Sequence, residues 1–147
     1  MRKKTWLSFV STFVIFAGAL APAAAQERTP PSGLSLQLNT VQQLEDGTCR
    51  IVFVADNGTS EEIEKMSVET VLFGPDGTVN RFTLFDFRDL PAGKTRVRQF
   101  DLGGTECTSI GRILVNGAAD CTIGGAASGV CIEKLATSSA VDVEFSG

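Results

Sequence analysis

The sequence predicts an all-β protein, an antiparallel β-sandwich of about seven strands with two disulfides. Three observations predict this class. Short runs of apolar residues alternate with polar ones and are separated by turns that contain Gly, Pro and Asp. No segment keeps the apolar period of about 3.6 residues that a surface helix needs. Four cysteines, an even number, are available to pair.

The first two predicted strands flank an Asp-Gly turn. Residues 34–38 alternate Leu with Ser and Gln, which predicts a strand with one buried face. The Asp-Gly pair at 46–47 favours a tight turn, because Gly accepts a positive φ. Residues 49–55 are rich in Ile, Val and Phe, which is typical of a central strand, and Asp-Asn-Gly at 56–58 ends it.

A hairpin is predicted next. Residues 61–65 are polar and acidic, so we expect a loop there. Residues 66–73 and 79–87 carry the apolar pattern of two strands. Gly-Pro-Asp-Gly at 74–77 is a strong turn signal between them, because Pro presets one backbone angle and Gly accepts positive φ.

Three further strands complete the predicted sandwich. Leu-Pro-Ala-Gly at 90–93 marks a turn into a strand over residues 94–102, and another strand is predicted over residues 110–116. The Gly- and Ala-rich stretch 124–129 is predicted to be a loop. Over residues 141–145, Val, Val and Phe alternate with Asp and Glu, which predicts the last strand.

The N-terminal region has the three-part layout of a secretory signal. Arg2, Lys3 and Lys4 form a basic start, and an apolar run without charge covers residues 6–20. Three Ala residues at 23–25 then offer the small side chains that signal peptidase requires. We therefore expect cleavage after residue 25, and the lack of a paired Arg-Arg favours the general secretory route (Sec).

These signals divide the chain into three parts. We expect a signal peptide over residues 1–25, a flexible Pro-containing leader over residues 26–33, and a β-sandwich domain over residues 34–147. Sec export of a bacterial chain predicts a periplasmic protein with no stable membrane insertion after cleavage. The alternative is an uncleaved anchor, because residues 5–25 are just long enough to span a bilayer.

The cysteines predict an oxidising compartment and two disulfides. A zinc site would need closely spaced thiol pairs or His partners, and the sequence has neither. Sequence proximity favours a bridge between Cys121 and Cys131, which leaves Cys49 and Cys107 to join distant parts of the chain. The other two pairings remain open at this stage.

The composition argues against several function classes. The chain has 147 residues and a net charge of −4, which becomes more negative once the basic start is removed, so we expect no nucleic-acid partner. The chain has no His, which removes the usual nucleophile pairs and the commonest metal ligand. It has no Tyr, and its only Trp, Trp6, lies in the predicted signal, so sugar rings would find few aromatic platforms. We therefore expect neither an enzyme nor a cofactor.

A row of cations is the first candidate site. Lys94, Arg96 and Arg98 share one face of a predicted strand, spaced about 6.7 Å apart. One interpretation is a contact for a partner or an anion. The other, which is favoured, is a solvated sheet face paired with acidic neighbours such as Glu69.

An acidic stretch is the second candidate site. Asp56, Glu61, Glu62 and Glu64 offer clustered oxygens that could hold Ca²⁺, but their spacing does not match an EF-hand loop, so no metal is expected. The neighbouring Asn-Gly-Thr at 57–59 fits the N-glycosylation pattern, which we expect to be idle behind a bacterial signal.

Several motifs between residues 49 and 116 carry a family resemblance. They are Cys-Arg-Ile-Val-Phe-Val at 49–54, Val-Leu-Phe at 71–73, Leu-Pro-Ala-Gly-Lys-Thr at 90–95 and Ile-Gly-Arg-Ile-Leu-Val-Asn at 110–116. In these motifs the chain resembles an uncharacterised group of small exported alphaproteobacterial proteins and, more distantly, FxLYD-type immunoglobulin-like domains of envelope proteins. Phe73-Gly74 stands where the FxLYD pattern has Tyr-Asp, and the core Trp and Tyr corner of antibody domains are missing. The resemblance implies an immunoglobulin-like sandwich and an envelope setting, and it implies no activity.

The sequence thus predicts a non-catalytic periplasmic binding or accessory module for another cell-envelope protein. The alternative is a carrier of a small ligand or ion, and a hydrolase that uses paired carboxylates comes third. An exposed apolar patch or an unpaired edge strand would favour the first function. A concave pocket with convergent polar groups would favour the second, and a carboxylate pair in a cleft the third.

Overall fold

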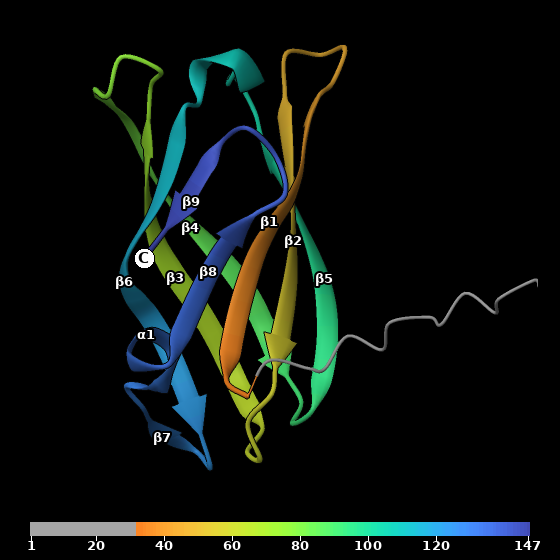
Figure 1. Cartoon of the computed structure of the whole chain (residues 1–147), viewed down its shortest axis with the longest axis vertical. Coiled ribbons are helices and arrows are strands. Elements are labelled where there is room, and N and C mark those ends of the chain that lie inside the picture. Colours follow the sequence, from red (N-terminus) through yellow and green to blue (C-terminus); the bar gives the residue numbers. More distant parts are fainter. Residues whose placement is uncertain (1–31) are drawn as a thin grey trace, which may run out of the picture.

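The computed structural model describes residues 32–147, which form two β-sheets packed face to face (Figure 1). Sheet A has the strand order β5-β2-β1-β8, and sheet B has the order β4-β3-β6-β7, with β9 also paired to β6. The predicted all-β sandwich is confirmed. The predicted signal peptide, and the predicted leader except for its last two residues, lie outside the described residues.

The strands of the two sheets come from both halves of the chain. Sheet A contains β1 (Leu34–Gln43), β2 (Cys49–Asn57), β5 (Lys94–Leu102) and β8 (Leu135–Ser139). Sheet B contains β3 (Ile63–Phe73), β4 (Val79–Leu90), β6 (Arg112–Ile123), β7 (Ala126–Ala127) and β9 (Glu144–Ser146). A 3₁₀ turn, η1 (Cys107–Ser109), precedes β6, and a one-turn helix, α1 (Val130–Glu133), precedes β8. Between residues 32 and 147, no helix is long and apolar enough to cross a membrane.

Two strand pairs make the sandwich mixed rather than purely antiparallel. β8 runs parallel to β1, and β9 runs parallel to β6, whereas the other paired strands are antiparallel. β8 was not among the predicted strands, because Leu135 is its only large apolar residue and gives no alternating pattern. β8 and β9 therefore each add a parallel strand to one of the two sheets.

The bounds of several strands differ from the expected ones, and β1, β2 and β4 extend beyond the expected ends at residues 38, 55 and 87. β3 begins at Ile63, inside the expected loop, because Ile63 is fully buried and pairs with Leu90 of β4. β6 continues to Ile123 because its pairing with β3 continues. The last strand begins at Glu144 rather than at residue 141, since the Ser139 hydroxyl lies within hydrogen-bond distance of two carbonyl oxygens further along and holds the intervening segment as a turn.

Both favoured disulfides are present. Cys49–Cys107 joins the start of β2 to η1, and Cys121–Cys131 joins β6 to α1. Cys49 pairs with Leu102 in the ladder between β2 and β5, so the start of one strand lies beside the end of the other. This adjacency explains why the cysteine just beyond β5 reaches the one that opens β2.

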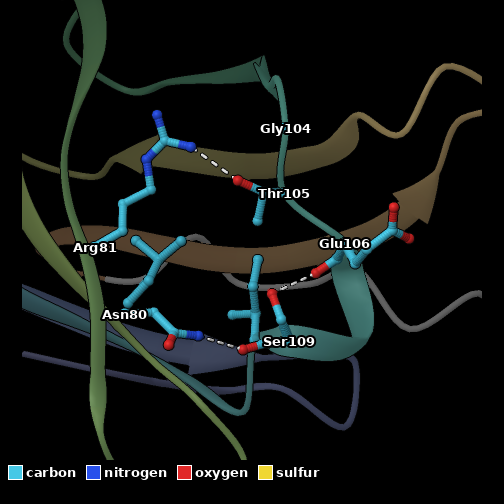
Figure 2. Close-up of a pocket in the computed structure, with 8 residues that line it drawn as sticks. Asn80, Arg81, Gly104, Thr105, Glu106 and Ser109 are labelled. Atoms are coloured by element: carbon cyan, nitrogen blue, oxygen red, sulfur yellow. Dashed lines mark hydrogen bonds between the residues drawn. The ribbon is translucent and has the colours of Figure 1, made fainter.

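The connection between β5 and β6 packs against the start of β4 (Figure 2). The Arg81 guanidinium donates a 2.8 Å hydrogen bond to the Thr105 hydroxyl, and the Asn80 amide donates a 2.7 Å bond to the Ser109 carbonyl oxygen. Nearby, a Cβ atom on Gly111 would fall 2.8 Å from the Cα atom of Pro75, so this close approach requires Gly. One end of the sandwich is thereby closed.

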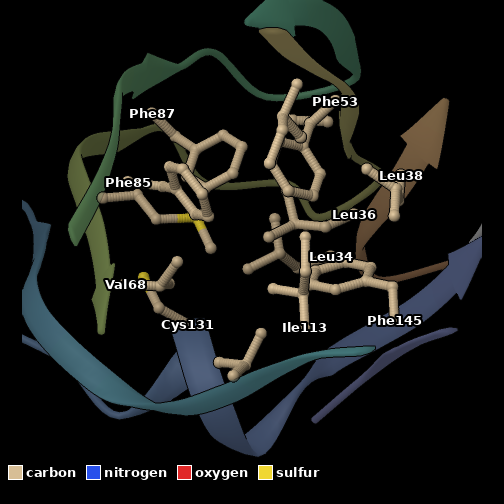
Figure 3. Packing of buried hydrophobic residues seen from close by; sticks show 14 of the residues in the cluster. Leu34, Leu36, Leu38, Phe53, Val68, Phe85, Phe87, Ile113, Cys131 and Phe145 are labelled. Atoms are coloured by element: carbon tan, nitrogen blue, oxygen red, sulfur yellow. The ribbon is translucent and has the colours of Figure 1, made fainter. Parts of the chain in front are cut away.

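The core lies between the sheets and is centred on Phe53 of β2 (Figure 3). Its ring packs at centroid distances of 5.3 Å from Phe85, 5.5 Å from Phe87 and 5.1 Å from Phe145. Alternate Leu residues of β1 complete the floor of this cluster and are fully buried. Since alternate residues of a strand point to opposite faces, each sheet turns its other face outward.

Candidate functional site

The outer face of sheet B carries two large, exposed apolar side chains on its edge strand. Phe82 is 71% exposed and Leu84 is 53% exposed, and both belong to β4. Phe85 and Phe87, at the alternate positions, point into the core. β4 pairs with β3 along one side, and within residues 32–147 no strand pairs with its other side. The exposed apolar residues therefore lie at a free sheet edge.

Cross-strand pairing arranges this face in three rows that run across β4, β3 and β6. The apolar row is Phe82, Val71 and Leu114; the mixed row is Leu84, Glu69 and Gly117; the acidic row is Asp86, Ser67 and Asp120. Successive rows lie about 6.6–6.8 Å apart, because they are two residues apart along β3. We call this surface the three-row face, and it changes from apolar to acidic along the strands.

A hollow of about 500 Å³ borders the first two rows. Its lining includes Phe82, Leu84 and the side chain of Glu69. At the far end of the face, the Arg112 guanidinium carbon lies 4.1 Å above the centre of the Phe73 ring, so a cation ends the face there. The hollow therefore offers space for an apolar side chain of a partner next to Glu69.

Hydrogen bonds of two arginines, Arg98 and Arg81, fix the two ends of β4 and leave the free edge of its middle residues without such contacts. Arg98 of β5 donates from Nε to the Phe87 carbonyl oxygen over 2.7 Å and from Nη2 to the Asp89 carbonyl oxygen over 3.2 Å. At the other end, Arg81 reaches across to the β5–β6 connection. In the described part of the chain, no side chain of sheet A hydrogen-bonds to residues 82–86. An unpaired edge of this kind is a template for a further strand.

The basic stripe predicted on β5 lies where the edges of the two sheets meet. Nitrogens of Arg96 and Arg98 lie 3.9 Å and 3.5 Å from the Asp89 carboxylate of β4, while Lys94 is exposed. Glu69, the acidic neighbour suggested by the sequence, lies instead on the three-row face. Two of the three cations thus join the edge of sheet A to the edge of sheet B.

The acidic stretch has separate structural contacts. Asp56 accepts a hydrogen bond from the Thr95 hydroxyl, and the Glu64 carboxylate accepts one from the Gly125 N–H over 3.1 Å. Among residues 32–147, no group of three or more His, Cys, Asp or Glu side chains is arranged to hold a metal ion. Asn57 of the glycosylation pattern is 1% exposed and donates from Nδ2 to the Leu90 carbonyl oxygen, so that amide is occupied in the fold.

A second hollow, of about 420 Å³, lies between the start of β4 and η1 (Figure 2). Its polar groups are engaged mainly with one another. Arg81 binds Thr105, Asn80 binds the Ser109 carbonyl oxygen, and the Ser109 hydroxyl donates to the Glu106 carbonyl oxygen over 2.7 Å. These bonds hold the β5–β6 connection against the start of β4. The polar groups around the hollow therefore serve the packing of this connection and do not converge on a ligand.

The sequence-based search missed the three-row face. The run Phe-Thr-Leu-Phe-Asp-Phe at 82–87 places apolar residues at both parities, whereas a strand buried on one face needs only one. That change of parity is the signal that could have found Phe82 and Leu84. The contribution of β6 could not be read in this way, because Asn116 and Ala119 are skipped in its pairing with β3 and reset which residues face outward.

The fold and this face define a disulfide-linked β-sandwich with one exposed, partly apolar sheet face. In comparisons with known proteins, no family model and no curated protein matches the sequence. A solved structure, that of IrmA from Escherichia coli, is similar with a TM-score of 0.60. The match covers 71% of this chain and 90% of that chain at 13% sequence identity, and it shows a shared fold alone.

Proposed function

We propose that this chain is a non-catalytic binding module of the bacterial periplasm, which docks another cell-envelope protein on the three-row face. The observation that carries the proposal is Phe82, which is 71% exposed on an edge strand next to an exposed Leu84. Apolar surface in water costs about 25 cal/mol per Å² relative to burial. A cluster of such residues at one place therefore supports a protein-binding role.

Two further features support the periplasmic setting. Disulfides persist in oxidising compartments, and both cysteine pairs of this chain are bonded. The N-terminal pattern of residues 1–25 matches a Sec signal. The envelope setting implied by the family resemblance agrees with both.

The open middle of β4 suggests how the partner binds. An extended segment of the partner would add a strand beside residues 82–86, with main-chain hydrogen bonds providing affinity. Alternate side chains of that segment would then face the rows, and one apolar side chain would enter the hollow beside Phe82 and Leu84. This mode requires the partner segment to be extended rather than helical.

Site-specific crosslinking in the periplasm tests this function. A photoreactive amino acid in place of Leu84 should yield an adduct with one envelope protein, identified by mass spectrometry. The matched control is Val97, which is 60% exposed on sheet A and should yield no such adduct. Phe82→Ser should abolish the Leu84 adduct, and Val97→Ser should leave it unchanged. Equal adducts from both positions, or none from position 84, would contradict the proposal.

The stability of the same variants separates binding from folding. Phe82→Ser and Val97→Ser should each change the free energy of unfolding by less than about 0.5 kcal/mol, because both residues are exposed. Phe85→Ala, in the core beside them, should cost about 3–5 kcal/mol. A loss for Phe82→Ser as large as that for Phe85→Ala would place Phe82 in the core and overturn the proposal.

A further inference from the structure

We propose that the acidic row of the three-row face, Asp86, Ser67 and Asp120, binds the guanidinium group of an arginine side chain on the partner. The inference rests on the proposed function and names the chemistry that the partner must bring. Three observations carry it: a buried hydroxyl without a partner, a cavity above it, and an excess of negative charge around that cavity.

Ser67 is the polar group of the three-row face whose burial is unexplained. It is 8% exposed, and its Oγ is buried and has no hydrogen-bond partner among the described residues. Buried hydroxyl groups in folded proteins are nearly always hydrogen-bonded, because the group gives up its bonds to water on burial. A serine left unsatisfied on an outward-facing position of a central strand is therefore a candidate contact for a ligand.

A cavity of about 310 Å³ lies over this residue. Ser67, Asp86 and Asp120 line it together with Lys65 and Leu84. Ser67 pairs directly with Asp86 of β4 on one side and with Asp120 of β6 on the other, so the two acidic residues flank the serine in one row. The register of three strands, and no single motif, brings these groups together.

The charges around the cavity favour a cation. Among the residues that line the cavity, Asp86 and Asp120 are opposed by one ammonium group, that of Lys65, which lies 3.4 Å from Asp120 Oδ2 and has a side chain that is 70% exposed. Glu69 in the next row adds a further negative charge. Because Lys65 is exposed and its contact is long, an incoming cation can replace it beside Asp120.

The spacing and anchoring of the two carboxylates favour a guanidinium over a metal ion. They project from strands two spacings apart, which is about 9–10 Å. Asp86 Oδ1 accepts the Arg88 N–H over 2.9 Å, and Asp120 Oδ1 accepts the Thr122 hydroxyl over 2.9 Å, so neither side chain is free to converge on a small ion. A guanidinium presents five N–H groups in a planar fork and can reach acceptors on both sides. Its flat face also suits the exposed Leu84 side chain.

The order of the rows defines the partner's sequence pattern. In an extended segment aligned with β4, side chains two residues apart lie about 6.6–6.8 Å apart, which is the spacing of the rows. An arginine over the acidic row therefore places the residue four positions away over the apolar row. A second copy of this chain is disfavoured as the occupant, because it would add its own acidic row to a surface that is already acidic.

Nuclear magnetic resonance titration of the purified, isotopically labelled protein tests the site without the partner. The probe is acetyl-arginine methylamide, and the matched control is its neutral isostere, acetyl-citrulline methylamide. Saturable shifts are expected at the amides of Ser67, Asp86 and Asp120 with the arginine probe only. Asp86→Asn with Asp120→Asn keeps both Oδ1 acceptors and should weaken binding at least about tenfold. Asp142→Asn, which removes one carboxylate charge in the turn before β9, should alter it less than about twofold.

Several outcomes would overturn the assignment. They are equal shifts with the citrulline probe, unchanged binding in the double variant despite a well-dispersed spectrum, and equally tight binding of acetyl-lysine methylamide. The crosslink from position 84 connects this test to the proposed function and is expected to disappear in the double variant. If the adduct persists while arginine binding is lost, the partner does not use the acidic row, and only the guanidinium assignment fails. If position 84 gives no adduct while arginine still binds, the proposed function fails instead.

Discussion

Asn57 shows how a single buried residue can connect the end of a strand to two loops. Its Nδ2 donates to the carbonyl oxygens of Leu90 and Glu61 over 2.7 and 2.8 Å, and its Oδ1 accepts from the N–H and the hydroxyl of Thr59. Its own carbonyl oxygen accepts the Gly93 N–H over 2.7 Å. The residue therefore ties the end of β2 to the β2–β3 loop and to the turn between β4 and β5.

Asn57→Ala should cost about 2–4 kcal/mol of unfolding free energy, because two carbonyl groups lose their donor in a largely buried site. Urea denaturation followed by circular dichroism measures the loss. Asn39→Ala is the matched control, since Asn39 is exposed and makes only exposed side-chain bonds, and it should change stability by less than about 0.5 kcal/mol. Equal effects of the two substitutions would show that the Asn57 bonds contribute little.

Asp101 shows a pH effect of one exposed ion pair. Arg50 donates from Nε and Nη2 to the two carboxylate oxygens of Asp101, each over 2.8 Å, and these hydrogen bonds lower the pKa of Asp101 below its usual 3.8. Because the folded-state pKa is the lower one, the stabilisation is present above the unfolded pKa and is lost as the pH falls through the folded one.

Carboxyl titration by nuclear magnetic resonance should therefore place the Asp101 pKa below 3.8, and Arg50→Gln should raise it toward that value. The stability difference between the parent chain and Arg50→Gln should shrink as the pH falls below about 3.8. An Asp101 pKa that does not respond to Arg50→Gln would refute the assigned cause.

At the scale of elements, the two disulfides should differ in how much they contribute to the free energy of unfolding. Cys49–Cys107 spans 58 residues and Cys121–Cys131 spans 10. In the chain-entropy model the long bridge contributes about 4 kcal/mol and the short one about 3 kcal/mol. Replacing both members of each pair by Ala should therefore destabilise the protein more for the long bridge, as measured by urea unfolding.

The same urea series under reductant isolates the effect of packing. The parent chain loses both bridges there, so any remaining difference between it and the Ala variants reflects the packing of the buried cysteines. If the short bridge proves the more stabilising after this correction, loop length is not the dominant factor in this protein.

Strands in which every second residue is buried could be predicted from the sequence, and strands without this alternation could not. β2 alternates buried and half-buried residues along its whole length, so its pattern is plain in the sequence. β8 has no such pattern. It is a short edge strand, and it is held in sheet A by hydrogen bonds to β1 rather than by burial of its side chains. Arg88 adopts a φ of 60° at a bulge in β4, a conformation that its residue type does not indicate.

The candidate site was harder to predict than the fold. The cysteine pairs could be favoured from sequence distance alone, whereas Asp86, Ser67 and Asp120 come from three strands and meet only through their register. The basic stripe lies on the side of β5 that also carries the buried Leu102, rather than on a solvated sheet face, and Arg96 and Arg98 lie beside Asp89 of the other sheet. Alternation predicts which side a residue faces, and it does not predict which strand lies opposite.

At the scale of the whole molecule, the surface character of the three-row face changes along the strands from apolar to acidic. The chain is acidic, with a net charge of −4, and the three-row face runs from an apolar row to an acidic one. Charge complementarity of this kind speeds encounter with a cationic partner and disfavours contact between copies. Binding should therefore weaken as ionic strength rises, while the apolar row fixes the register.

The parallel pairing of β8 with β1 has a consequence for how the chain is made. β1 is the first strand of sheet A to leave the ribosome or the translocation channel, and its second neighbour is among the last. β6 likewise waits for β9 before that part of sheet B is complete. During this interval two hydrogen-bonding edges are bare, and bare edges invite pairing between neighbouring nascent chains. Holding factors at the exit site, or a low rate of synthesis, would protect such a chain until β8 and β9 have emerged.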